Sequence, residues 1–205
     1  MGLDGDRTGA VSELPPFVRE ARASASQSAF EYSCDDRVGR LLAVLAASVP
    51  PGGRVLELGT GAGVGTAWIV HGLRDRSDVE VVTIEMDPNI AATFARHPWP
   101  AFVCPLVGDA VEMVSSLGQF DLIFADAQGG KWERLDLTVD ALRAGGYLLV
   151  DDMTPCESWE AEQVTKQSQV RRALCENPIL VASEMEWATG VILCARRREV
   201  RDVPH

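Results

Sequence analysis

Short runs of apolar residues alternate with stretches of helical spacing through most of this chain. Each run is long enough for one buried strand, and each stretch between runs is long enough for one helix. The predicted strands span residues 54–58, 79–85, 101–107, 119–126 and 147–151. Such alternation is typical of an α/β protein with a parallel, doubly wound sheet.

Apolar residues at helical spacing predict a helix over 36–49, ended by the prolines and glycines of 50–53. Further helices are expected over about 64–73, 88–96 and 131–143. Asp87 followed by Pro88 is a good helix start, because Asp caps the first amides and Pro fits the first helical position. Thr154 to Glu157 has the capping-box pattern and is expected to open a long helix to about Glu176. A short helix is expected after Asp109.

Two late strands, residues 179–183 and 191–196, have no helix between them and should form an antiparallel edge. The predicted fold class is therefore α/β: a doubly wound, mostly parallel seven-stranded sheet with an antiparallel last strand and N-terminal helices. We expect residues 1–12 to be disordered and 13–205 to form one domain. Within it, 13–50 would be a helical cover and 53–197 the α/β core.

The composition is that of an ordinary globular protein with an acidic surface. Hydrophobic residues make up 46% and charged residues 24% of the 205 positions, enough for a proper core. The formal net charge of -11 makes a phosphate backbone an unfavourable partner, and 6% aromatic residues offer no stacking platform. We therefore expect no nucleic-acid partner.

The cysteines and the apolar segments indicate a soluble, cytoplasmic protein. The five cysteines are scattered, so neither zinc nor a disulfide framework is expected and reduced thiols are the default. The acidic N-terminus lacks the apolar core of a signal peptide. The longest uncharged stretch, residues 41–53, is too short to span a bilayer and contains two prolines.

A glycine-rich turn follows the first predicted strand. Glycines occupy every second position from Gly59 to Gly65, and Glu57 stands two residues before the first of them. The dinucleotide spacing G-x-G-x-x-G fails, because Val64 and Thr66 stand at the sixth positions counted from Gly59 and Gly61. A turn of this kind with an acid before it fits a nucleoside-like ligand without a pyrophosphate. We interpret it as an S-adenosylmethionine (SAM) site.

Acidic residues stand at or just beyond the carboxyl end of every predicted parallel strand. They are Glu57, Glu85, Asp109, Asp126 and the pair Asp151-Asp152. Ligands of doubly wound sheets bind outside these strand ends, and carboxylates there are costly without a partner. The set predicts one shared ligand pocket.

Three of the acids can each be given a role at such a ligand. Glu85 lies twenty residues after Gly65, close to the spacing at which an acid takes a ribose diol. Asp109 is placed to accept from the exocyclic amine of adenine. Glu57 could accept backbone N–H bonds of the turn or reach the ligand's ammonium.

Five segments of the chain together resemble the motifs of class I SAM-dependent methyltransferases. They are the glycine turn after Val55-Leu56-Glu57, then Thr83–Asp87, Val107–Ala110, Phe120–Ala127 and Leu142–Asp152. The resemblance covers about residues 30–197. The last two segments are similar to the small O-methyltransferases of the catechol and caffeoyl-CoA type, which implies a Rossmann-like methyltransferase fold.

The resemblance implies a cofactor site and a metal site. The glycines would line the methionine part of SAM, Glu85 would bind ribose, and Asp109 with Ala110 would flank adenine. The predicted cofactor-binding residues are Glu57, Gly59, Thr60, Gly61, Gly63, Glu85, Met86, Asp109, Ala110 and Asp126. The family's divalent metal, Mg²⁺ or another cation, would be held by Asp126, Asp151 and Asp152, since hard cations prefer oxygen ligands.

Two positions depart from that family. The second acid of the pair is Asp152 where the family has Asn, which leaves the identity of the metal open. The family often has a lysine three residues after the acid of the fourth of these segments. That acid is Asp126 here, and Lys131 comes five residues after it. Asp126 and Lys131 are the predicted catalytic residues, but an exposed lysine in the first turn of a helix is an equally good interpretation of Lys131.

The implied reaction is an in-line displacement, in which a hydroxyl oxygen of a small molecule attacks the sulfonium methyl. A metal, if present, would lower the pKa of that hydroxyl. Trp132 and Trp159 could wall the acceptor pocket. A non-catalytic SAM-binding or interaction protein and a nicotinamide-dependent oxidoreductase remain as alternatives, and a homodimer is an open alternative for the assembly.

Overall fold

The structure is a computed structural model, and it describes residues 13–156 and 159–198. The predicted disorder of residues 1–12 lies outside these described residues. Within them, no helix is both long and apolar enough to cross a membrane.

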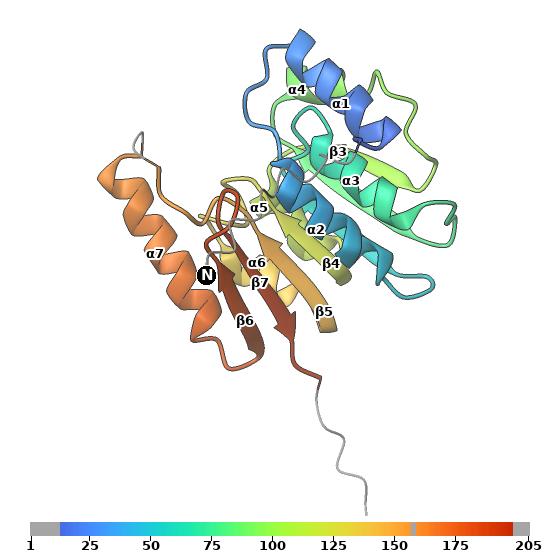
Figure 1. The fold of residues 1–205 in the computed structure, drawn as a ribbon. Helices are drawn as coiled ribbons and strands as arrows, with labels where there is room; N and C mark the ends of the chain where they lie inside the picture. The colour runs from blue at the N-terminus through green and yellow to red at the C-terminus, as the bar shows by residue number, and fades with distance from the viewer. Residues whose placement is uncertain (1–12, 157–158, 199–205) are drawn as a thin grey trace, which may run out of the picture.

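One seven-stranded sheet organises the molecule (Figure 1), in the order β3-β2-β1-β4-β5-β7-β6. The strands are β1 Arg54–Leu58, β2 Glu80–Glu85, β3 Val103–Val107, β4 Phe120–Ala125, β5 Leu142–Val150, β6 Leu180–Met185 and β7 Val191–Arg196. The first five strands in this order, β3-β2-β1-β4-β5, pair in parallel. Strand β7 is antiparallel to both of its neighbours, β5 and β6. The predicted Rossmann-like fold with an antiparallel last strand is confirmed.

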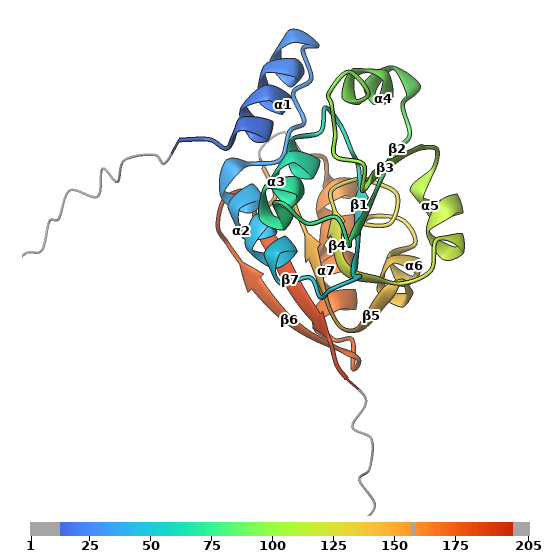
Figure 2. The ribbon, with the colours of Figure 1, turned by 90° about the vertical axis from the view of Figure 1, so that its right-hand side faces the viewer.

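Helices cover both faces of the sheet. They are α1 Pro16–Gln27, α2 Asp36–Ala47, α3 Val64–Leu73, α4 Pro88–Phe94, α5 Ala110–Met113, α6 Leu135–Asp140 and α7 Ala161–Cys175, with a 3-10 turn at Val114–Ser116. Figure 2 shows α2 and α3 on one side of the strands and α5 and α6 on the other. Residues of α1 to α4 join one buried cluster, and residues of α5 to α7 join a second.

The strands divide their buried residues between these two clusters because side chains alternate across a sheet. Val55 and Phe124 face the first cluster, whereas Leu56 and Ile123 face the second. Each is 0% exposed, so the central strands are covered on both faces. The order of connection reverses between β1 and β4, which places a ligand crevice beyond the carboxyl ends of these two strands.

The predicted start of the last long helix is wrong. The helix α7 begins at Ala161, where Glu160 and Gln163 form the capping box, and the Glu160 amide donates to Gln163 Oε1 at 2.9 Å. Thr154 is instead held in a loop, since its amide donates to the Thr189 carbonyl at 3.0 Å. The expected partner of the Thr154 cap, Glu157, lies outside the described residues.

The helix expected over 131–143 is also shorter than predicted, because α6 begins only at Leu135. The amides of Lys131, Trp132 and Glu133 all donate to the Gln128 carbonyl, which makes a tight turn in place of a helix. Arg134 follows with a left-handed φ of 55° and separates this turn from α6. Residues 142–146 belong to β5, so the helix also ends early.

Candidate cofactor and acceptor site

The glycine-rich turn adopts a backbone that requires glycine. Gly59 and Gly61 have φ values of +95° and +54°, which L side chains rarely adopt. The amides of Gly59 and Thr60 both donate to the Ile84 carbonyl of β2, at 3.0 and 3.1 Å. A Cβ at Gly59 would also lie 2.8 Å from the Asp126 carbonyl. The turn is thus packed tightly between β2 and the end of β4.

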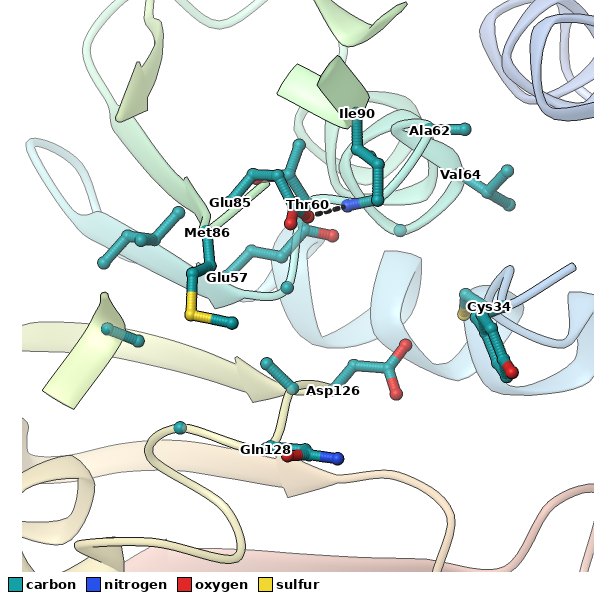
Figure 3. Close-up of a pocket in the computed structure, with 18 of the residues that line it drawn as sticks. Cys34, Glu57, Thr60, Ala62, Val64, Glu85, Met86, Ile90, Asp126 and Gln128 are labelled. Carbon is teal, nitrogen blue, oxygen red and sulfur yellow. Dashed lines mark hydrogen bonds between the residues drawn. The ribbon is translucent and has the colours of Figure 1, made fainter. Parts of the chain in front are cut away.

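A cavity opens beside this turn (Figure 3), between the ends of β1, β2 and β4. It is lined by nine of the ten predicted cofactor residues: Glu57, Gly59, Thr60, Gly61, Glu85, Met86, Asp109, Ala110 and Asp126. Gly63 is not among the lining residues. It precedes α3, and a Cβ there would meet Phe94 and Trp99 at 2.8 Å, so this glycine serves packing.

Two acids of the cavity are oriented by backbone amides. Glu85 accepts from the Gly61 amide at 2.9 Å through one oxygen and from the Asp87 amide at 3.0 Å through the other. Asp109 caps α5 by accepting from the Val111 amide at 2.8 Å. Each carboxylate keeps lone pairs for a ligand, because one oxygen can accept more than one hydrogen bond. The sequence therefore brings both predicted nucleoside contacts to one cavity.

Glu57 lies completely buried beneath the turn. Its Oε2 accepts from the Thr83 hydroxyl at 2.6 Å and also from the Thr66 hydroxyl. Its Oε1 is buried and has no hydrogen-bond partner among the described residues. Burial raises the pKa of Glu57 to about 7, and the two hydroxyls oppose that rise. Glu57 lines the cavity beside the turn, so this oxygen is an acceptor without a partner at the cavity wall.

Three carboxylates meet where β4 and β5 end. Asp126, Asp151 and Asp152 each offer an oxygen, and these atoms lie within 4.8 Å of one another. Asp151 accepts from the Asp152 amide at 2.7 Å and from the Thr189 hydroxyl. Asp152 has a left-handed φ of 56°, which Asp tolerates better than most residues. We call these three residues the acid trio.

Lys131 places its ammonium in the acid trio. Its Nζ lies 3.2 Å from Asp152 Oδ2, 3.2 Å from the Asp151 carbonyl and 3.8 Å from Asp126 Oδ1. Only 2% of this residue is exposed. The interpretation of Lys131 as an exposed first-turn lysine is therefore wrong, because the turn at Gln128 points it inward despite the altered spacing.

Charge repulsion and burial both act on the acid trio. Burial raises the pKa of Asp126, Lys131 lowers it, and the neighbouring acids raise it further. Burial and Asp152 together raise the pKa of Asp151 to about 6, against the Thr189 hydrogen bond. When ionised, the three carboxylates outnumber the single Lys131 ammonium and leave excess negative charge at this partly buried site. A bound cation would neutralise that charge.

A second cavity also borders Asp126, and we call it the acceptor cavity. The acid trio, Lys131 and the two predicted aromatic residues line it. Trp132 and Trp159 pack edge to face, with ring centroids 5.7 Å apart. They form the wall expected from the sequence, although both stand in loops and neither begins a helix.

One segment that lines both cavities was not predicted from the sequence. Tyr32, Ser33 and Cys34 follow α1. They border both the cavity beside the glycine turn, which we call the cofactor cavity, and the acceptor cavity. The Ser33 hydroxyl is buried without a partner among the described residues. Nearby, Phe30 packs where a Cβ at Gly61 would lie, at 2.9 Å. The sequence predicted only that residues 13–50 form a helical cover, and it gave these three residues no role.

Known proteins resemble this chain over most of its length. A model of the methyltransferase-domain family matches residues 56–153. A Mycolicibacterium smegmatis protein named "Putative O-methyltransferase" is 36% identical, over 91% of this chain and 99% of its own. One of the same name from Mycolicibacterium vanbaalenii is 30% identical, over 94% and 95%. The chain belongs to the O-methyltransferase family.

Solved structures agree with the fold of this O-methyltransferase. TomG, an O-methyltransferase of Streptomyces achromogenes crystallised with SAM, superposes with a TM-score of 0.77 at 20% identity over 92% of this chain and 93% of its own. A Bacillus cereus O-methyltransferase in complex with SAH gives 0.77 at 18% identity, over 92% and 94%. The prediction of a SAM-dependent O-methyltransferase with a Rossmann-like fold is confirmed.

Proposed function

We propose that this O-methyltransferase holds SAM in the cavity beside the glycine turn and methylates a small-molecule hydroxyl bound in the acceptor cavity. Asp126 carries the proposal, because it borders both cavities and belongs to the acid trio. If the SAM methyl group and the acceptor hydroxyl meet beside one residue, the two need little further alignment for an in-line methyl transfer.

The cofactor cavity fits SAM on three features. The Glu85 carboxylate, fixed by two amides, suits a ribose diol, and Asp109 suits the adenine amine. The partnerless Glu57 Oε1 suits a cationic donor. SAM supplies an electrophilic methyl group on its sulfonium. The protein's part is to hold that group still and to exclude water from it.

The acid trio fits a hard divalent cation such as Mg²⁺. It offers three carboxylate oxygens within 4.8 Å, and its charge with Lys131 is two units negative if all three acids are ionised. Such a cation, when bound, lowers the pKa of a neighbouring hydroxyl. Asp126, Asp151 and Asp152 would hold it.

Lys131 is proposed to stabilise negative charge on the attacking oxygen. Its Nζ is already engaged with three oxygen acceptors, which favours this role over that of a general base. A buried ammonium acts through a low local dielectric and needs no reorganisation during the reaction. Asp126 orients the ammonium from the cofactor side.

We further propose a small-molecule partner and a cytoplasmic location. A small molecule is favoured over nucleic acid by the net charge of -11. Five free cysteines are consistent with a cytoplasmic location. A homodimer stays an open alternative for the assembly.

The test is the variant Asp126→Asn, with SAM affinity and turnover measured separately. Asn keeps the size of the side chain and removes its charge, so the cofactor Kd should stay within about threefold while turnover falls at least about a hundredfold. Asp136→Asn, on the exposed first turn of α6, is the matched control and should change neither. Full turnover by Asp126→Asn would overturn the proposed role of the acid trio.

A further inference from the structure

The ammonium of Lys131 contacts every member of the acid trio. Its Nζ lies 3.2 Å from Asp152 Oδ2, 3.2 Å from the Asp151 carbonyl oxygen and 3.8 Å from Asp126 Oδ1. Only 2% of the residue is exposed, so little solvent screens these charges. The acid trio is therefore already supplied with one positive charge by the protein itself.

A divalent cation would use the same group of oxygens. The three carboxylates each offer an oxygen, and these atoms lie within 4.8 Å of one another. Mg²⁺ binds its oxygen ligands at about 2.0–2.1 Å in a near-octahedral arrangement, so it needs these oxygens turned toward itself. Two positive charges close together in a buried place also repel each other strongly. The ammonium and a divalent cation are thus competitors for the acid trio.

The backbone of Lys131 is fixed, but its side chain has a second place to lie. The Lys131 amide donates to the Gln128 carbonyl at 3.3 Å, and the Gly130 carbonyl accepts from the Thr138 hydroxyl at 2.7 Å. The flexible four-carbon stem of lysine lets the ammonium move while this turn stays in place. Trp132, whose ring centre lies 5.3 Å from Nζ, offers its face to a displaced ammonium. Lys131 and Trp132 both line the acceptor cavity, so the ammonium would remain there.

The second lysine of the acceptor cavity is engaged elsewhere. Lys166 lines the cavity from α7 and pairs with Glu162, one turn earlier on the same helix, at 3.1 Å. Its side chain is 40% exposed, in contrast to that of Lys131. Of the two lysines that line this cavity, only Lys131 pairs with the acid trio among the described residues. Lys166 is therefore a matched control for Lys131.

We propose that Lys131 is the internal counter-ion of the acid trio and that a divalent cation displaces its ammonium into the acceptor cavity. This inference rests on the proposed function and adds a regulatory step to it. Without the cation, the acid trio holds the ammonium. With the cation bound, the ammonium is released to face the attacking oxygen, so the cation controls when Lys131 takes up its proposed role.

The first measurement is the affinity for Mn²⁺, which carboxylates bind as they bind Mg²⁺ and which electron paramagnetic resonance detects directly. Lys131→Met removes the competing charge and should bind Mn²⁺ at least about tenfold more tightly than the wild type. Lys166→Met should stay within about twofold of the wild type. If Lys131→Met folds poorly, Lys131→Gln makes the same comparison with a side chain that still donates hydrogen bonds. An affinity that is unchanged or weaker in the Lys131 variant overturns the inference.

The second measurement follows the ammonium itself by NMR of protein with isotopically labelled lysine nitrogens. Hydrogen exchange of the Lys131 ammonium should become at least about tenfold faster with saturating Mg²⁺, because its three oxygen acceptors are lost. The Lys166 ammonium should not change, and the Lys131 signal is assigned by its loss in Lys131→Met. An exchange rate at Lys131 that is unchanged or slower overturns the displacement.

Neither measurement uses turnover, so the inference can fail while the proposed function stands. Absence of Mn²⁺ binding in both the wild type and Lys131→Met overturns the inference together with the proposed cation site. Tighter binding in Lys131→Met and faster exchange with Mg²⁺, in a protein that binds SAM but methylates no hydroxyl, would support the inference and contradict the proposed function.

Discussion

Replacing Glu57 by glutamine should make the protein less sensitive to rising pH. Glu57 is completely buried, and burial raises its pKa from the ordinary 4.5 to about 7. A carboxyl whose pKa is raised on folding favours the protonated native state. Its contribution to the free energy of unfolding is therefore fully present below the unfolded pKa and is lost as the pH rises through the folded pKa. Above the folded pKa no further change occurs.

The magnitude follows from the two pKa values. Their difference corresponds to about 3 kcal/mol of lost stability once Glu57 is fully ionised. Most of this loss, roughly 2–3 kcal/mol, falls between about pH 5 and about pH 8.5. Glutamine does not ionise, and its carbonyl oxygen can still accept from the Thr66 and Thr83 hydroxyls.

The assay is urea unfolding of both proteins without SAM across that pH range. The difference in free energy of unfolding, Glu57→Gln minus wild type, should grow by about 2–3 kcal/mol from the acidic to the alkaline end. Asp126 and Asp151 titrate equally in both proteins, so their contributions cancel. A constant cost of placing the amide in this site shifts the whole curve without changing its slope. A difference that does not change with pH would refute the assignment of a raised pKa to Glu57.

Three further outcomes follow from the site. Lys131→Met should lower turnover by about 10²–10³-fold, because the attacking oxygen loses its charge partner. SAM affinity should stay unchanged, since Lys131 does not line the cofactor cavity. Unchanged turnover contradicts the proposed role of Lys131. Dialysis against EDTA should abolish turnover, and added Mg²⁺ should restore it and raise the Tm; activity that survives EDTA would show that the acid trio works without a cation. Glu85→Ala should raise the Kd for SAM about 10–100-fold and leave kcat at saturating SAM within a few-fold, whereas an unchanged Kd would remove Glu85 from the ribose contact.

Much of the fold could be predicted because its signals are local. The strand over 54–58 and the helix over 64–73 have the predicted bounds, since an apolar run, a glycine turn and helical spacing follow one another directly. The Asp87 cap also forms as expected. The start of α7 failed for a non-local reason. The Thr189 carbonyl, 35 positions further along the chain, holds Thr154 in a loop against its own capping pattern.

The site was predictable where a strand end fixes the residue. Glu57, Glu85, Asp109 and Asp126 reach one cavity because parallel strands end at the same edge of a sheet. Lys131 was ambiguous, because the turn that buries it has no pattern of its own. The contributions of Tyr32, Ser33 and Cys34 were not found, since their place depends on how the segment between α1 and α2 crosses the sheet edge.

The central claim is tested most directly by following the methyl group itself. The protein would be incubated with SAM carrying an isotopically labelled methyl group, Mg²⁺ and a panel of hydroxylated small molecules. The products would be identified by mass spectrometry and NMR. The account predicts the label on a hydroxyl oxygen of the acceptor, with one demethylated cofactor formed for each ether, and loss of the labelled ether in Asp126→Asn. Bound SAM with no labelled ether from any hydroxylated acceptor would contradict it.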